Sequence, residues 1–209
     1  MAYKILIVDD HLVVKTGVKI ILQSEIEGLS ISFGADFCDL LQILSKENYD
    51  LIILDINIPG GKNTEMITEI KAMMPEVKVL MFSAYEEESH ALRYIQAGAN
   101  GYLNKLSGED KIVAAVNSIM NHGEYIPDDI RSLLQAKKLN NEPINPFDKL
   151  SNRELEITKL LIKGNGNLEI SNSLNIQMST VSTYKNRIFE KLKINNLVEL
   201  IEVYQLYLS

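Results

Sequence analysis

The fold is indicated first by the stretch Tyr3-Lys4-Ile5-Leu6-Ile7-Val8-Asp9-Asp10, residues 3–10. It is a short apolar run that ends in two acids. Other runs of this kind lie at 51–54, 77–82 and 101–103, and a less apolar candidate lies at 29–33. The first four runs do not alternate apolar with polar residues, which is typical of parallel strands that helices cover on both faces. The sequence therefore predicts a parallel sheet whose first strand begins at Tyr3.

Amphipathic stretches separate these strands. Val14, Val18 and Leu22 share one helical face, and so do Phe37, Leu40, Leu41 and Leu44. Further helices are expected at 64–74, 87–96 and 108–121. Five strands alternating with five helices predict an α/β fold: a doubly wound, five-stranded parallel sheet of about 120 residues.

The remainder of the chain is organised differently. Prolines and the pair Asn140-Asn141 indicate a linker at 123–147 with a short helix at 128–138. Beyond it the pattern is helical only, with helices expected to 163 and at 167–174, 179–192 and 195–207. Ser151 followed by Glu154 is a capping-box pattern that opens the first of them. The expected division is 1–122 for the α/β domain, 123–147 for the linker, and 148–209 for a smaller all-α domain.

Charge is distributed unevenly between these parts. The chain has 209 residues and a net charge of −7, of which residues 1–147 carry −8 and residues 148–209 carry +1. The expected helix near 179–192 and the residues just after it have a small basic excess, which is the pattern of a nucleic-acid contact. The single cysteine, Cys38, excludes an internal disulfide framework. No run approaches the roughly 18 apolar residues of a membrane span, and we expect a cytoplasmic protein without a membrane partner.

Polar side chains follow the ends of the predicted strands. Asp9 and Asp10 follow the first strand, Asp55 the third, Ser83 the fourth and Lys105 the fifth. The carboxyl ends of parallel strands meet at one edge of a sheet. A cluster of carboxylates needs a cation, and oxygen ligands suit Mg²⁺, while a lysine and a hydroxyl could hold a phosphoryl group. Singly, each aspartate could be a helix cap and the lysine a solvated charge.

With these motifs in place, residues 1–121 resemble a response-regulator receiver domain, which has a flavodoxin-like fold. The matching segments are Ile5–His11, Leu54–Gly60, Phe82–Ala84 and Gly98–Lys105. The resemblance implies that Asp55 accepts a phosphoryl group from a sensor histidine kinase. It also implies that Asp10, Asp55 and the main-chain carbonyl of Asn57 ligate Mg²⁺, and that Asp9 assists through water.

The same resemblance assigns roles around the phosphoryl group. Lys105 contacts it, and Ser83 and Tyr102 form a switch pair of hydroxyl and ring. Asn57 and Tyr85 flank the path of the hydrolytic water, and we expect the Tyr85 ring to shield it. Two positions depart from the usual pattern: Leu106 stands where proline is common, and Asn63 where glycine is common.

Residues 148–209 resemble the helix-turn-helix domain of NarL/LuxR-type regulators. The match includes Leu150–Glu154, Gly164, Asn167, Glu169–Ile170, Leu174, Thr180–Val181 and Lys191–Leu192. A helix at 179–192 with Val181, Ile188 and Leu192 inward fits the major groove of double-stranded DNA. The expected DNA contacts are Ser179, Thr180, Ser182, Thr183, Lys185, Asn186 and Lys191. The alternative is a helix that only packs.

Two features of this domain affect its expected DNA affinity and its expected assembly. Ser182, Tyr184 and Leu168 stand where lysine, histidine and lysine are usual, so phosphate contact should be weak for a monomer. The apolar stripe Leu197, Leu200, Ile201, Tyr204 and Leu208 could form a homodimer contact on DNA or pack against the domain's first helix.

The sequence thus predicts a phosphorylation-dependent DNA-binding transcription regulator rather than a turnover enzyme. One alternative is a phosphohydrolase of the haloacid-dehalogenase type, but that family has a second acid where Asn57 stands here. The other alternative is an interaction module whose helical domain binds protein.

Overall fold

The structure is a computed structural model that describes residues 3–84, 87–140, 143 and 145–208. The chain divides into two compact units, Met1–Ala136 and Lys137–Ser209. The division falls inside the segment expected to be a linker.

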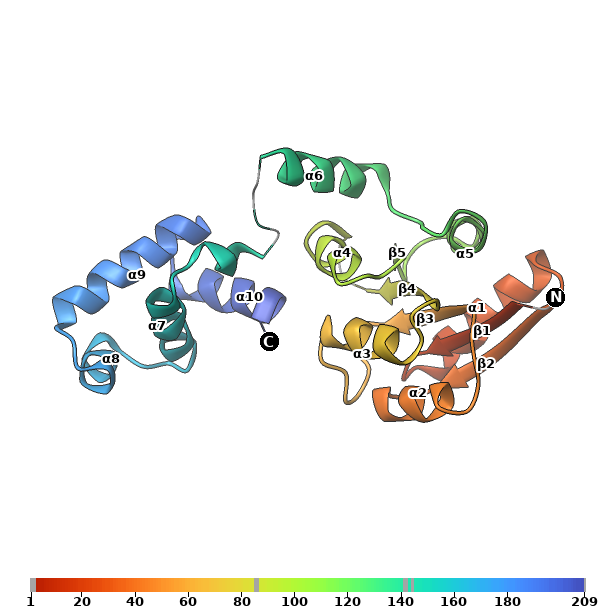
Figure 1. The fold of residues 1–209 in the computed structure, drawn as a ribbon, viewed down its shortest axis with the longest axis horizontal. Coiled ribbons are helices and arrows are strands. Elements are labelled where there is room, and N and C mark those ends of the chain that lie inside the picture. Colours follow the sequence, from red (N-terminus) through yellow and green to blue (C-terminus); the bar gives the residue numbers. More distant parts are fainter. Residues whose placement is uncertain (1–2, 85–86, 141–142, 144, 209) are drawn as a thin grey trace. The chain divides into compact units, whose positions relative to one another are not determined.

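The first unit contains a five-stranded parallel sheet with the strand order β2-β1-β3-β4-β5 (Figure 1). Its strands are β1 (Tyr3–Val8), β2 (Leu29–Gly34), β3 (Leu51–Asp55), β4 (Lys78–Ser83) and β5 (Gly101–Asn104). All five expected strands are present, and the order is that of a doubly wound fold. Four strands, β2 to β5, extend one residue beyond the expected end, so that Asp55 and Ser83 are the last residues of β3 and β4.

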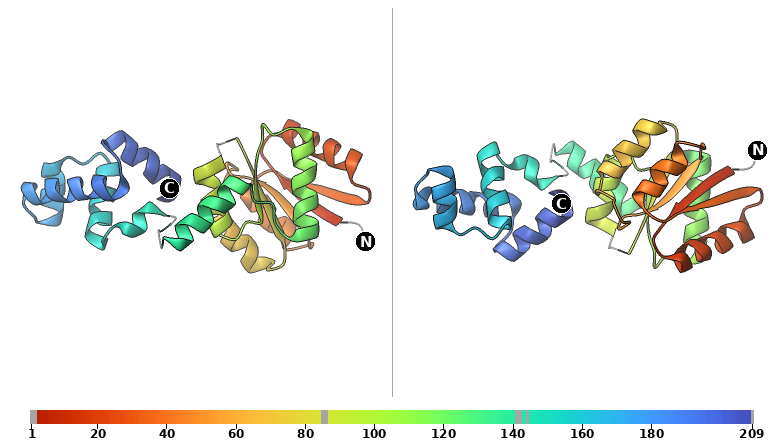
Figure 2. Two further views of the ribbon diagram at one scale, coloured as in Figure 1. Left: turned by 90° about the horizontal axis from the view of Figure 1, so that it is seen from above. Right: turned by 90° about the horizontal axis from the view of Figure 1, so that it is seen from below.

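Helices cover both faces of this sheet (Figure 2). They are α1 (Leu12–Glu25), α2 (Phe37–Leu44), α3 (Glu65–Met73), α4 (Glu87–Gln96) and α5 (Glu109–His122). Alternate strand residues such as Ile5, Ile53 and Phe82 pack with Val18 of α1 and Val116 of α5 in one apolar cluster. The intervening residues of the same strands are also buried, which explains why the strand sequences are apolar without alternation.

The register of the paired strands determines where the site residues lie along the sheet. Val8 pairs with Leu54, Asp55 with Phe82, and Ser83 with Asn104. The residues that follow these positions therefore come together at the carboxyl edge of the sheet.

The segment after α5 remains attached to the first unit. Helix α5 ends at Gly123, whose φ is +86°, and Tyr125 then forms a single parallel bridge with Gly101 of β5. Helix α6 (Asp128–Leu139) follows, and its Ile130 is fully buried. The expected short helix is present, and the first part of the expected linker packs on the α/β unit.

The second unit is helical in its described residues. It contains a 3₁₀ turn (Pro146–Lys149), α7 (Asn152–Ile162), α8 (Asn167–Leu174), α9 (Met178–Leu192) and α10 (Leu197–Leu208). The Ser151–Glu154 capping box is confirmed. Helix α10 begins two residues later than expected, because Asn196 Oδ1 accepts a hydrogen bond from the Glu199 N–H (3.0 Å) and caps the helix. Among the described residues, the structure has no helix that is long and apolar enough to cross a membrane.

Candidate metal centre and nucleic-acid interface

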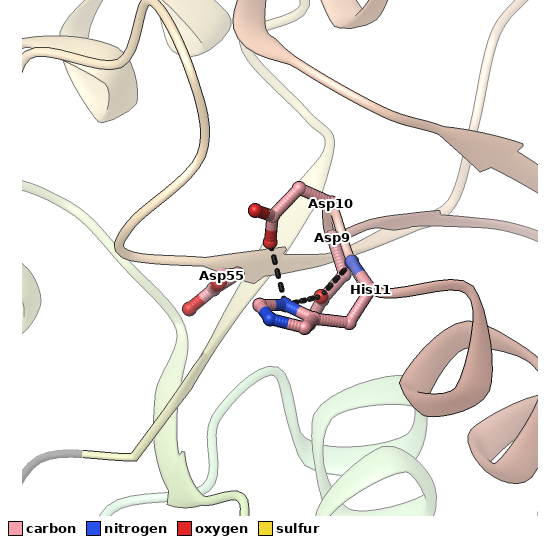
Figure 3. Close-up of side chains that lie close together, drawn as sticks. All are labelled: Asp9, Asp10, His11 and Asp55. Atoms are coloured by element: carbon pink, nitrogen blue, oxygen red, sulfur yellow. Dashed lines mark hydrogen bonds and ion pairs between the residues drawn. The ribbon is translucent and has the colours of Figure 1, made fainter.

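Three carboxylates gather at the carboxyl edge of the sheet, as the sequence predicts. Asp9 and Asp55 are 1% and 4% exposed, whereas Asp10 and the neighbouring His11 are exposed. One ligand atom from each of these four side chains lies within 4.8 Å of the others, from the loop after β1 and the end of β3 (Figure 3). Two buried carboxylates so close together are stable as anions only beside a cation. The cluster can therefore hold a metal ion.

Lys105 supplies a positive charge to the same place. Its backbone N–H donates to the carbonyl of Ser83 (2.7 Å), which continues the β4–β5 pairing beyond the strands. Its ammonium then lies 2.7 Å from Asp9 Oδ2 and 2.9 Å from Asp55 Oδ2. Burial by itself would lower the pKa of Lys105, but hydrogen bonds and charge attraction from Asp9 and Asp55 outweigh it and raise that pKa. The side chain stays an ammonium at neutral pH.

His11 is a member of the cluster that the sequence interpretation did not select. Its Nδ1 lies 2.6 Å from Asp10 Oδ1 and 3.1 Å from Asp9 Oδ1, and its backbone N–H donates to Asp9 Oδ1 (2.8 Å). Its position directly after the two acids was the available signal. The imidazole fixes how both aspartates point and offers a nitrogen ligand beside them.

The other expected residues of this site lie on the surrounding elements. Ser83 at the end of β4 is buried, and Tyr102 in β5 is fully buried and pairs with Met81 in the sheet. Asn57 is exposed in the loop after β3. Tyr85 lies outside the described residues, so its expected shielding role stays a prediction.

A hollow of about 500 Å³ lies at the opposite, amino-terminal edge of the sheet. Tyr3, Tyr49, Met73 and Met120 contribute to its lining. None of the clustered acids lines it, so the acid cluster and this hollow are separate features of the unit.

In the second unit, α9 has the expected inner face, with Val181, Ile188 and Leu192 buried. Ser179, Ser182, Thr183 and Asn186 are exposed on other faces of the helix. The Ser182 hydroxyl accepts a hydrogen bond from Asn167 Nδ2 (3.1 Å), which joins α8 to α9. Helix α9 begins at Met178, and its N-cap residue Gln177 makes no side-chain capping bond, so the Met178 and Ser179 amides lack a cap, while the Thr180 N–H donates to the Gln177 carbonyl (2.9 Å).

Two lysines among the expected DNA contacts interact with side chains of the unit itself. Lys185 is four residues after Val181 and therefore beside the buried stripe; its Nζ lies 5.6 Å from the centre of the Phe189 ring. Lys191 Nζ lies 2.7 Å from Glu154 Oε2, and that glutamate is buried. Both ammonium groups are thus engaged within the unit.

Arg187 is the basic residue of the outward face, and the sequence interpretation missed it. It is exposed, and it directly follows Asn186 on the side of α9 away from Val181. Counting helical positions from the buried stripe would have selected it in preference to Lys185.

Comparisons with known proteins identify a family for each of the two units. Residues 5–117 match the family described as response regulator receiver domain, and residues 148–204 match the bacterial regulatory proteins of the luxR family. The response regulator GacA of Pseudomonas aeruginosa is 35% identical over 200 residues, covering 94% of this chain and 92% of its own length. The oxygen regulatory protein NreC of Staphylococcus carnosus is 32% identical over 206 residues, covering 95% of each chain.

The chain is a two-component response regulator. It joins a receiver domain to a LuxR-type DNA-binding domain, and proteins of this family are transcription factors rather than turnover enzymes. The family membership decides against the phosphohydrolase alternative.

Solved structures show the same fold for this response regulator. The RcsB protein of Salmonella enterica serovar Typhimurium, bound to a promoter in the presence of a phosphomimetic, aligns with a TM-score of 0.75 at 21% identity, covering 99% of each chain. A complex of RcsB with DNA aligns with a TM-score of 0.72 at 22% identity, covering 98% of each chain.

The departures from the usual receiver pattern have local consequences in this response regulator. Asn63 has a φ of +46°, in the left-handed region where glycine is common and asparagine is tolerated. The described residues contain no cis peptide bond, so the bond before Leu106 is trans.

Proposed function

We propose that this response regulator accepts a phosphoryl group on Asp55 from a sensor histidine kinase and then binds double-stranded DNA through α9. The observation that carries the proposal is Asp55 itself, a buried carboxylate 2.9 Å from the ammonium of Lys105 and close to the other acids. A regulator that meets both a kinase and the chromosome acts in the cytoplasm.

Phosphoryl transfer needs an oxygen nucleophile and charge neutralisation, and the residues of this edge supply both. An Asp55 carboxylate oxygen attacks the phosphorus, the new P–O bond forms, and the P–N bond to the kinase histidine breaks with its electron pair on the nitrogen. The Lys105 ammonium, now paired with Asp55, turns to a phosphoryl oxygen as the carboxylate loses its charge. Ser83 then donates its hydroxyl to another phosphoryl oxygen, and Tyr102 packs behind it.

The donor set fits Mg²⁺. Asp9, Asp10 and Asp55 provide oxygen ligands, and the charge of Lys105 offsets only one of three carboxylates. Asp10, Asp55 and the Asn57 carbonyl would hold the ion directly, and Asp9 would hold it through water. When bound, Mg²⁺ neutralises charge on the phosphoryl oxygens.

The DNA contacts proposed for α9 are Ser179, Thr180, Ser182, Thr183 and Asn186, whereas Lys185 and Lys191 are engaged within the unit. Hydroxyls and first-turn amides suit phosphate oxygens, and an asparagine suits an adenine edge in the major groove. Lys185 and Lys191 could contact DNA only by leaving Phe189 and Glu154. We therefore propose Arg187 as the principal charge of this face.

A homodimer on DNA is the proposed assembly. Two residues of the apolar stripe that the sequence suggested for the dimer belong to the core instead. Leu200 is fully buried, and the centres of the Tyr204 and Phe147 rings lie 5.8 Å apart in an edge-on arrangement. Val198, which is 64% exposed, is an apolar side chain of α10 that a partner subunit could contact.

Acetyl phosphate, Mg²⁺ and intact mass spectrometry test the acceptor. Wild type should gain one phosphoryl group, and Asp55→Asn should gain none. Asp50→Asn, which changes an exposed aspartate just before β3 at the amino-terminal edge of the sheet, is the matched control and should label normally. Undiminished labelling of Asp55→Asn would remove Asp55 from this role.

A further inference from the structure

Asn100, in the turn before β5, hydrogen-bonds with several elements at once. Its Oδ1 accepts from the Val79 N–H (3.0 Å) in β4 and from Lys71 Nζ (3.1 Å) in α3. Its Nδ2 donates to the carbonyl of Gly123 (2.9 Å) at the end of α5. Two donors face the oxygen and a carbonyl faces the nitrogen, so only one orientation of this amide satisfies its neighbours.

Asn100 also bonds to the segment that follows α5. We call this segment, residues 123–127, the linker root. Beyond the Gly123 contact, the Tyr125 N–H donates to the Asn100 carbonyl (2.8 Å). The hydroxyl of Ser118 donates to the Glu124 carbonyl (2.7 Å) between them. Side chain and main chain of Asn100 thus hold successive parts of the linker root, where a chain leaving a helix end would otherwise be solvated.

The linker root also lies directly against β5. A side-chain Cβ at Gly101 would lie 2.8 Å from the Tyr125 carbonyl oxygen, so the two backbones are in contact with no room between them. The next residue of β5 is Tyr102, whose side chain is fully buried. A shift of β5 at Tyr102 therefore moves the surface on which Tyr125 rests, and α6 follows only a few residues later, with Ile130 buried.

We propose that Asn100 is a positioning residue that fastens the linker root to β5 and so transmits the state of the phosphorylated site to the DNA-binding unit. The inference rests on the proposed function and names a route for its regulation. In this structure the linker root is docked and the Tyr102 side chain is fully buried.

The variant Asn100→Asp isolates the linker contact. A carboxylate still accepts from Val79 and Lys71, but it cannot donate to Gly123 and repels that carbonyl. Burial and repulsion from Lys78 lower the pKa of Lys71, and a carboxylate beside it would relieve this, so the fold should persist. Asn117→Asp, at an exposed asparagine of α5, is the control with the same change of charge.

The first readout is hydrogen exchange of the Tyr125 amide by NMR on the full chain. Asn100→Asp should speed this exchange about tenfold, the factor for one ordinary hydrogen bond, and Asn117→Asp should not. The second readout is the ratio of DNA affinities after and before treatment with acetyl phosphate and Mg²⁺. Asn100→Asp should label normally on Asp55 and lose most of the affinity gain.

Unchanged Tyr125 exchange in Asn100→Asp would overturn the proposal, because Asn100 would not hold the linker root. Faster exchange with an intact affinity gain would overturn the transmission. If wild type itself shows no gain on phosphorylation, the proposed function fails and the transmission fails with it. The exchange result would then still decide whether Asn100 holds the linker root.

Discussion

Lys191→Met separates a structural role of this lysine from a DNA contact. The ammonium of Lys191 lies 2.7 Å from Glu154 Oε2, which also accepts from the backbone N–H of Ser151 (2.7 Å) at the start of α7. Methionine keeps the length and the apolar stem of the side chain. The buried Glu154 carboxylate then keeps only its capping hydrogen bonds. The DNA-binding unit should therefore lose stability.

The magnitude follows from the geometry. A hydrogen bond to a charged group contributes about 1.5–3 kcal/mol. The Lys191 side chain is 40% exposed, so solvent screening places the pair at the lower end, about 1.5 kcal/mol. In a domain of this size each kcal/mol lowers Tm by about 4–8 °C, so calorimetry should show a transition about 6–12 °C lower.

The pH dependence has a definite sign. Burial raises the pKa of Glu154, but hydrogen bonds from Lys191 and Ser151 outweigh it and hold the pKa below its ordinary value of 4.5. A lowered pKa stabilises the fold above the ordinary value, and this stabilisation is lost as pH falls from there through the lowered pKa. Lys191→Met should reduce that loss, since less stabilisation remains to be lost.

DNA binding decides between the two roles. Once corrected for the unfolded fraction, Lys191→Met should bind DNA with the wild-type salt dependence. An unchanged Tm together with a salt slope reduced by about one would exclude the structural role and make Lys191 a phosphate contact.

Three further variants test the DNA contact, the dimer contact and the role of Lys105. Arg187→Ala should leave Tm unchanged and reduce the salt slope of DNA binding by about 0.9, whereas Lys159→Ala should not; an unchanged slope would remove Arg187 from the interface. Val198→Glu should leave the monomer folded and weaken two-site DNA binding, and equal binding to paired sites would argue against this dimer contact. Lys105→Met should tighten Mg²⁺ binding in calorimetric titration, because a competing cation is removed, and slow labelling by acetyl phosphate about a hundredfold; an unchanged rate would exclude Lys105 from the transfer.

The sheet could be predicted from sequence because its physics is local. Strands covered on both faces must be apolar throughout, and the apolar runs beginning at Ile5 and Leu51 show this without any tertiary knowledge. The acid cluster followed from topology, since parallel strands bring Asp9 and Asp55 to one edge. The capping box at Ser151 is likewise a pattern of neighbouring residues.

Contacts between distant residues could not be predicted in this way. Glu154 and Lys191 lie on different helices, and no local pattern announces their pairing. The bonds of Asn100 to Lys71 and Gly123 depend on how turns and helix ends meet in space. Lys185 is a different case, because its spacing from Val181 already indicated the buried side of the helix, and its charge was given more weight than its position.

Control of DNA binding by phosphorylation of Asp55 is the core of the proposed function. Its most direct test is the affinity of wild type and Asp55→Asn for a DNA fragment recovered by selection from genomic DNA, each measured at one salt concentration before and after treatment with acetyl phosphate and Mg²⁺. Wild type should bind about 5–150-fold more tightly after treatment, the usual range for coupling between two sites, and Asp55→Asn should not change. Equal affinities for treated and untreated wild type, or an equal gain in Asp55→Asn, would contradict control of DNA binding through Asp55.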